Sequence, residues 1–135
     1  MIEPVWPGCE SSSDESFRKF LKKKNIPLFP WSSQARGFFL KDTSEKKSYH
    51  PADPNLDEQK RVWHSEENLM KRDRCFEMAK EKGFEPIEIA LAYVLNQDFP
   101  VFPLIGPRNF IETESSVNSL KVQLTKEEMQ WLDLN

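Results

Sequence analysis

The sequence predicts an α/β fold in which short parallel strands alternate with helices. Two apolar runs, residues 27–31 and 101–105, are short and bounded by turn residues, which favours strands over helices. Segments with helical apolar spacing and capping signals lie around them. Strands that alternate with helices pair in parallel through right-handed crossovers. The 135 residues are long enough for one compact domain.

The first helix is expected over residues 12–24, because residues 12–15 have the spacing of a capping box. Its apolar face would carry Phe17, Phe20 and Leu21, and the three lysines at its end suit the negative pole of the helix dipole.

The strand at 27–31 contains prolines at both ends of its apolar core, and each proline removes a backbone donor. Residues 41–64 are polar and show no sustained apolar period, so they are interpreted as a long surface loop.

Two helices are expected in the middle of the chain. Ser65 is a suitable N-cap and Gly83 a suitable stop for the first of them, whose inner side would hold Leu69, Phe76 and Ala79. Pro86 opens the second helix, in which apolar residues recur at i, i+3, i+4 and i+7, namely Ile87, Ala90, Leu91 and Val94.

The C-terminal part follows the order strand, tight turn, helix, helix. A helix over residues 109–120 comes directly after the turn at Gly106. In the last helix Thr125 and Glu128 form a capping box, with Leu124 and Met129 at the positions of a hydrophobic staple. This helix is expected to end near residue 134.

Composition excludes several classes of function. The net charge of −3 comes from interleaved acids and bases, so no basic stripe for nucleic acid is present. No apolar run approaches the roughly 20 residues of a membrane span, and residues 1–7 lack the features of a secretory signal, which predicts a cytoplasmic location. Cys9 and Cys75 are isolated, as expected of ordinary reduced cysteines.

Two loops are expected to face one another. Loops that leave the carboxyl ends of parallel strands open on one rim, which places residues 31–37 opposite residues 106–109. The second loop leads into a helix N-terminus, where an anion is favoured and where Arg108 would add a charge-assisted contact. Spacing alone favours the plainer interpretation of a simple turn, a packed Trp31 and surface arginines.

Four segments favour a binding site over this plainer interpretation. Residues 27–39 contain an aromatic-Ser-x-x-x-Arg-Gly pattern, and together with residues 89–97, 102–109 and 124–132 they resemble, in the same order, the C-terminal half of the aldo-keto reductases. The resemblance implies that residues 1–135 are a partial NADP-dependent oxidoreductase domain. It also implies the C-terminal portion of a (β/α)8 TIM barrel, with about two parallel strands and the surrounding helices.

The resemblance further implies a nicotinamide dinucleotide as ligand. Trp31 would stack under the nicotinamide, and the loop after it would contact the pyrophosphate. NADP is the expected cofactor, but NAD stays open because Glu112 stands where many relatives carry Arg or Gln. The implied binding residues are Trp31, Ser32, Gln34, Arg36, Gly106, Pro107, Arg108, Glu112, Ser115 and Ser116.

The catalytic residues of the family are absent from the matched positions. The family's Asp, Tyr, Lys and His lie on earlier strands of the barrel, and neither Tyr49 nor Tyr93 matches the catalytic tyrosine. His50 and His64 show no ligand spacing. The chain is therefore interpreted as the cofactor-binding part of a carbonyl reductase, inactive alone. The alternatives are a non-catalytic interaction remnant, or half of a split enzyme completed by another chain. Because most strands of the barrel are missing, self-association or a partner chain that supplies them is also expected.

Overall fold

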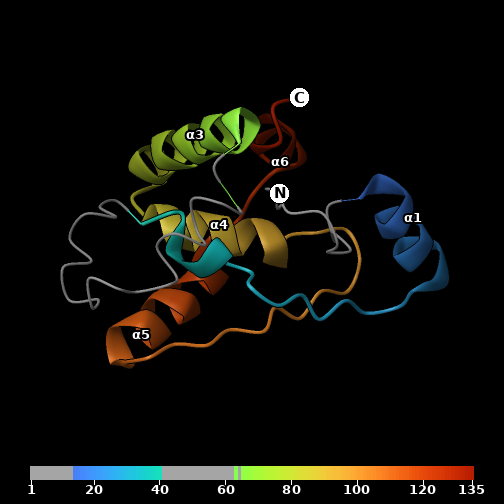
Figure 1. Ribbon diagram of the computed structural model, residues 1–135, viewed down its shortest axis with the longest axis horizontal. Helices are drawn as coiled ribbons and strands as arrows, with labels where there is room; N and C mark the ends of the chain where they lie inside the picture. The colour runs from blue at the N-terminus through green and yellow to red at the C-terminus, as the bar shows by residue number, and fades with distance from the viewer. Residues whose placement is uncertain (1–13, 41–62, 64) are drawn as a thin grey trace.

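A computed structural model describes residues 14–40, 63 and 65–135, and in this part of the chain helices make up most of the regular structure (Figure 1). The predicted polar loop at 41–64 lies outside the described residues except for Trp63. The elements are α1 (Glu15–Lys24), the 3₁₀ helix η1 (Ala35–Gly37), α3 (Glu66–Lys82), α4 (Pro86–Leu95), α5 (Phe110–Asn118), the 3₁₀ helix η3 (Ser119–Lys121) and α6 (Lys126–Leu132).

Helix α4 is the centre of the fold. It packs against α3 on one side and against α5 and η3 on another, and α6 packs on α3 (Figure 1). Ile89 and Ala92 are completely buried, as expected for a helix that is apolar on nearly every side. The core around α4 consists of Ala35, Phe38, Phe39, Cys75, Met78, Ala79, Ile89, Ala90, Ala92, Tyr93, Val122 and Leu132.

Helix α3 has the predicted ends but a different buried face. The Ser65 hydroxyl accepts the N–H of Asn68 at 3.1 Å, and Gly83 ends the helix with a φ of +74°. Of the predicted inner residues only Ala79 is buried, whereas Leu69 is 39% exposed. The buried row begins one residue earlier, at Asn68, whose amide nitrogen donates to the Trp63 carbonyl at 3.1 Å.

Helix α1 starts later than predicted. Its N-cap is Asp14, and the predicted cap Ser12 lies outside the described residues. Hydrogen bonds from the Ser16 hydroxyl and the Phe17 N–H hold the pKa of Asp14 below its usual range. Leu21 is buried, but Phe17 and Phe20 are exposed, because α1 lies at one end of the molecule, away from α3 and α6 (Figure 1).

The two predicted strands pair in parallel, but neither is a regular strand. Leu28 forms an isolated parallel bridge with Val101. The Leu28 N–H donates to Pro100 O at 2.9 Å, Phe102 N–H to Leu28 O at 2.8 Å, and Leu104 N–H to Pro30 O at 2.9 Å. The ladder would next need a donor from Pro30 to Phe102, which proline lacks. The parallel pairing is thus confirmed, and the prediction of two strands is wrong in the described part of the chain.

Helix α6 confirms the predicted capping box. The Glu128 N–H donates to Thr125 Oγ1 at 3.2 Å, and the Thr125 N–H donates to Glu128 Oε2 at 2.8 Å. Lys82 Nζ, from α3, lies 2.6 Å from Glu128 Oε1 and holds the pKa of that carboxyl below its usual range. The helix ends at Leu132, two residues before the predicted end.

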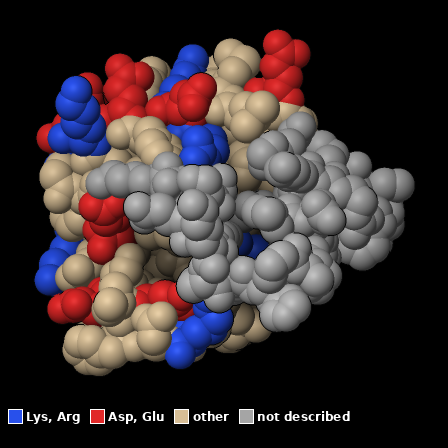
Figure 2. Space-filling view, turned by 60° about the vertical axis from the view of Figure 1, so that its left-hand side comes forward, with Lys and Arg blue, Asp and Glu red and all other residues tan. Residues whose placement is uncertain are grey.

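Charges of both signs are mixed on one face of the molecule. Lys and Arg side chains are interspersed with Asp and Glu on the face shown in Figure 2. Among the described residues, no helix combines the length and apolar character needed to cross a bilayer.

The central position of α4 gives a first prediction. Ile89→Ala should lower the free energy of unfolding by about 2–5 kcal/mol, because it leaves a cavity at a fully buried site. Ile111→Ala is the matched control, since Ile111 is 75% exposed, and its effect should stay within about 0.5 kcal/mol. Urea denaturation followed by circular dichroism at 222 nm measures both values. Equal effects of the two substitutions would contradict the buried position of α4.

Candidate functional site

The loop after the first paired segment is tightly wound. Ser32, Ala35 and Arg36 all have positive φ, between 47° and 53°, although none of them is a glycine. The turns close through hydrogen bonds from Ala35 N–H to Ser32 O at 2.7 Å and from Gly37 N–H to Gln34 O at 3.1 Å. Left-handed backbone at such residues costs free energy and persists where the surroundings enforce it.

Buried side chains anchor this loop on the helices. Ala35, Phe38 and Phe39 are buried in the core beside α4, and the two phenylalanine rings meet edge to face at 5.2 Å. The anchoring leaves Arg36 on the surface and keeps Ser32 and Gln34 half-buried.

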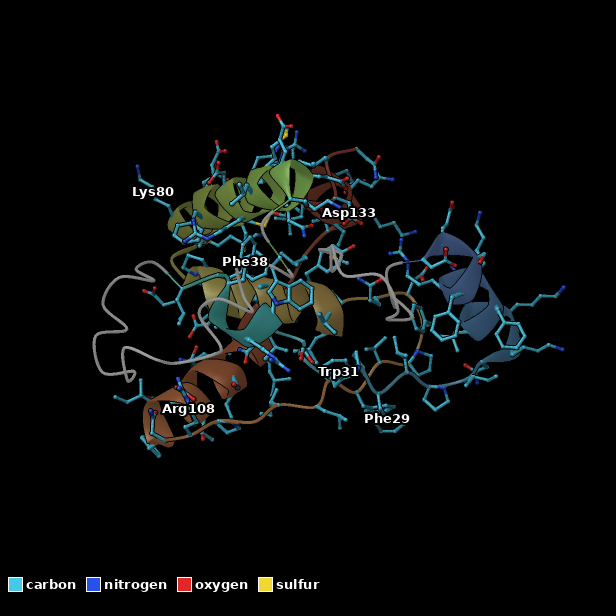
Figure 3. The ribbon with its side chains drawn as sticks, in the orientation of Figure 1. Phe29, Trp31, Phe38, Lys80, Arg108 and Asp133 are labelled. Carbon is cyan, nitrogen blue, oxygen red and sulfur yellow. The ribbon has the colours of Figure 1, made fainter. Side chains whose placement is uncertain are left out.

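Trp31 is at the start of the loop and is 63% exposed. Residues two apart in an extended segment point to the same face, which places Trp31 with Phe29 (Figure 3). Phe29 stacks on Phe102 of the second segment, with ring centroids 5.3 Å apart. Phe29, Phe102 and Leu104 are each more than half exposed, so the two segments share an apolar face that the described residues leave uncovered.

A hydroxyl connects the two segments where the loops begin. Ser33 Oγ donates to Pro30 O at 3.0 Å and to Leu104 O at 3.4 Å. The two loops, which were expected to face one another, are therefore close to each other where they leave the paired segments. The sequence analysis named Ser32 as a site residue and did not name Ser33, which connects the two segments. The available signal was a hydroxyl residue just after an expected strand.

The second loop leads into the N-terminus of α5. Gly106, Pro107 and Arg108 are exposed, and the space where a Gly106 side chain would lie is open. The Asn109 side chain caps the helix by accepting the Glu112 N–H at 2.9 Å. The N–H groups of Phe110 and Ile111 occupy the first turn, where a helix offers no internal acceptor, and both residues are exposed.

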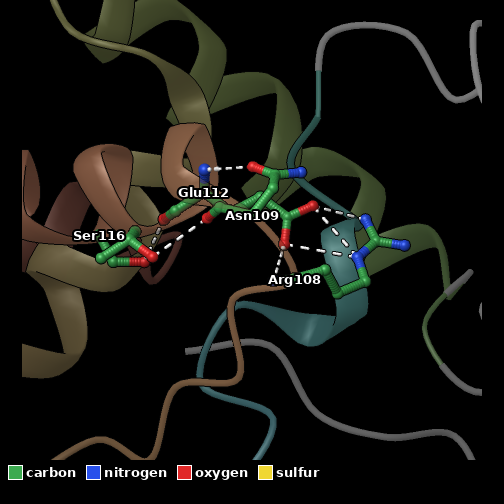
Figure 4. A network of polar contacts seen from close by, with 5 residues as sticks. Arg108, Asn109, Glu112 and Ser116 are labelled. Carbon is green, nitrogen blue, oxygen red and sulfur yellow. Dashed lines mark hydrogen bonds and ion pairs between the residues drawn. The ribbon is translucent and has the colours of Figure 1, made fainter.

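Arg108 and Glu112 form an ion pair over this first turn (Figure 4). Arg108 Nη2 donates to Glu112 Oε1 at 2.6 Å, and Nε donates to the same oxygen at 3.1 Å. The backbone N–H of Arg108 donates to Glu112 Oε2 at 2.8 Å. A carboxylate of the chain therefore occupies donors that would suit a phosphate. The sequence carried this signal in the i, i+4 spacing of opposite charges.

The two serines further along α5 differ in their environment. Ser116 is buried, and its hydroxyl donates to the Glu112 carbonyl at 2.8 Å, so it is turned back onto its own helix (Figure 4). Ser115 Oγ is buried and has no hydrogen-bond partner among the described residues.

Two ionisable side chains, those of Tyr93 and Cys75, are buried in the core. The Tyr93 hydroxyl donates to the Asp133 carboxylate, and burial together with that charge raises the pKa of Tyr93 far above its usual value. Burial raises the pKa of Cys75 to about 12, which keeps the thiol protonated and unreactive. In the described residues no group of three His, Cys, Asp or Glu side chains is placed to hold a metal ion.

Comparison with known proteins identifies the class to which this fold and site belong. The chain belongs to the aldo/keto reductase family, whose model matches residues 1–134. It is 28% identical to the versiconal hemiacetal acetate reductase of Aspergillus parasiticus over 109 residues, which is 80% of this chain and 32% of that protein. It is 29% identical to the norsolorinic acid reductase of Emericella nidulans over 129 residues, 93% of this chain and 31% of that protein.

The extent of these matches is uneven. They cover most of this chain, but the chain spans only about a third of the length of the curated relatives it matches. The family as a whole implies a (β/α)8 barrel and an NAD(P)H-dependent reduction of carbonyl groups.

Proposed function

We propose that this chain is the cofactor-binding C-terminal part of an NAD(P)H-dependent aldo-keto reductase. The proposal is supported by the family match over residues 1–134 and by the first turn of α5, where the N–H groups of Phe110 and Ile111 have no acceptor within the helix and Arg108 lies beside them. The parallel pairing of Leu28 with Val101 supports a partial barrel over residues 1–135. Such a protein would work in the cytoplasm.

The exposed groups fit the parts of a nicotinamide dinucleotide. Trp31 offers a flat face to the nicotinamide, and Ser32, Gln34 and Arg36 lie on the wound loop that would hold the pyrophosphate. Gly106, Pro107 and Arg108 would surround the adenosine 2′-phosphate. When bound, the dinucleotide supplies the hydride for carbonyl reduction; the residues of this chain bind and orient it.

The serines of α5 complete the proposed site. Ser115 would lie near the adenosine end of the cofactor, whereas Ser116, bonded to its own helix, would support the backbone at Glu112.

Glu112 would set the preference between the two cofactors. An exposed ion pair of this kind contributes about 0–1 kcal/mol, so a phosphate dianion would displace the carboxylate from Arg108. The displaced carboxylate would still lie within one helical turn of the phosphate and repel it. NADP remains the cofactor we favour, with weaker discrimination against NAD than an Arg or Gln at residue 112 would give.

The role of Arg108 is tested by Arg108→Ala. We expect NADPH binding to weaken by about 1.5–3 kcal/mol, the value of a charge-assisted hydrogen bond, and NADH binding to change little. Isothermal titration of the full chain with both cofactors gives the two losses. Equal losses for NADPH and NADH would place Arg108 away from the 2′-phosphate.

The role of Glu112 is tested by Glu112→Gln, which frees Arg108 and removes the repulsion. NADPH affinity should rise by about tenfold, corresponding to about 1.4 kcal/mol, without a matching rise for NADH. Glu114→Gln on the same helix is the control, because it makes the same change in net charge at an exposed residue outside the ion pair. An equal rise in both variants would mean that net charge alone is responsible.

We expect the chain alone not to reduce aldehydes or ketones with NADPH or NADH, because none of its residues matches the catalytic tyrosine. Tyr93 is buried and bonded to Asp133, which makes it a poor proton donor to any substrate. Oxidation of NADPH measured at 340 nm tests this. Turnover that survives purification and disappears in Tyr93→Phe or Tyr49→Phe would contradict the proposal.

The apolar face of the paired segments gives a prediction about assembly. Phe29, Phe102 and Leu104 are more than half exposed, and each such side chain gains about 1.5–3 kcal/mol when fully buried. We therefore expect the isolated chain to be partly molten, or to self-associate or bind a partner that carries the missing strands. Size-exclusion chromatography with light scattering and a thermal melt measure this. A strict monomer with a sharp transition and little dye binding would contradict it.

A second function from a different class rests on the Arg108–Glu112 pair. If the chain's own carboxylate keeps the phosphate donors, the chain is a non-catalytic interaction remnant of the family. Tight binding of NADPH or NADH by the purified chain would exclude this alternative. A split enzyme completed by a second polypeptide would instead bind the cofactor and gain turnover when the two chains are mixed.

A further inference from the structure

We propose that Arg72, on α3, is a positioning residue that holds the wound loop of residues 31–40 in the shape needed for binding phosphate. The inference rests on the proposed function, because this loop would contact the pyrophosphate of the cofactor. Arg72 itself would touch no ligand, and it would act through the backbone of residues 38–40.

The guanidinium of Arg72 bridges the end of the loop. Its Nε donates to Phe38 O at 2.8 Å and its Nη2 donates to Leu40 O at 2.9 Å. The planar guanidinium lies 4.2 Å from the ring centroid of Phe76 and 5.9 Å from that of Phe38. Two donors in a fixed fork, stacked on aromatic rings, define both the position and the orientation of these two carbonyls.

The loop needs such an attachment because its own conformation is unfavourable. Positive φ values at Ser32, Ala35 and Arg36 each cost free energy, and this cost must be offset by contacts outside the loop. The loop begins at the Pro30 carbonyl, which the Leu104 N–H fixes, and ends at the carbonyls that Arg72 fixes. Arg36, an exposed residue, lies in sequence between these two fixed points.

Burial alone does not define the loop's orientation. Phe38 and Phe39 fill the core, but apolar contacts are not directional, and the two rings would accept small rotations of the backbone. Hydrogen bonds from a half-buried guanidinium remove that freedom. Lysine at residue 72 would keep the charge but offers a single point of contact, so it would fix one carbonyl at most.

A matched control is available on the same helix. Arg74 is two residues further along α3, donates to the Trp131 carbonyl and lies 5.2 Å from the Trp131 ring centroid, so it joins α3 to α6 instead of to the loop. Loss of either arginine removes cationic hydrogen bonding to a backbone carbonyl and contact with an aromatic ring, two of each for Arg72 and one of each for Arg74. Only loss of Arg72 should change the loop.

The test compares Arg72→Gln, Arg72→Lys and Arg74→Gln in the full chain by hydrogen exchange and by titration with NADH, NADPH and inorganic pyrophosphate. The amides of Ala35, Gly37, Phe38 and Leu40 all have backbone acceptors, so their exchange reports the loop conformation. Arg72→Gln should accelerate this exchange and weaken binding of all three probes on the order of tenfold. Arg72→Lys should fall between it and the wild type, and Arg74→Gln should change neither.

The remaining outcomes are also decisive. Equal acceleration of loop exchange in Arg72→Gln and Arg74→Gln would show that both arginines act only through general stability, which overturns the inference. Unchanged loop exchange in Arg72→Gln would overturn it as well. If the wild type binds no probe, the proposed function fails. Loop exchange then still decides whether Arg72 holds the loop, and its role in phosphate binding falls with the function.

Discussion

Burial of α4 between α3 and the α5–η3 pair is the interaction on which the rest of the structure depends. Ile89 and Ala92 have no exposed surface, and α3, the wound loop and the segment leading to α6 all contribute to the cluster around them. Asn96, just after α4, donates through Nδ2 to Val122 O at 3.3 Å and so fixes the chain between η3 and α6. The candidate site therefore stands on a rigid layer of helices, while its loops lie at the surface.

Helices whose ends are set by local chemistry were predictable from the sequence. Ser65, Gly83 and Thr125 act as the caps expected of their side chains, because an N-cap oxygen or a left-handed glycine has the same role wherever a helix ends. The buried face of α3 was not predictable. Hydrophobicity pointed to Leu69, whereas the packing buries Asn68, whose amide nitrogen donates to the Trp63 carbonyl. That bond joins residues five apart at the start of the helix and leaves no periodic signal.

The candidate site shows the same division. The turn at Gly106, the helix N-terminus after it and the exposed arginines followed from the order of residues and from the family resemblance. From the sequence, Glu112 was expected to repel a 2′-phosphate. The sequence did not show that Glu112 pairs with Arg108, because that depends on side-chain geometry. The strands failed as predictions because Pro30 interrupts the ladder that the apolar runs would otherwise form. Parallel pairing survives because it needs only the three donors that remain.

The prolines of the paired segments have a consequence for how these segments meet other polypeptides. Backbone groups of an extended chain point alternately to its two sides, and the groups of Leu28 and Phe102 face inward, toward the partner segment. Pro27 and Pro103 therefore stand at outward-facing positions without a donor. Each outer edge therefore lacks one N–H donor, which disfavours indiscriminate strand addition. The exposed rings of Phe29 and Phe102 favour association with another polypeptide. The missing N–H groups of Pro27 and Pro103 restrict which strands can pair with the backbone at these edges.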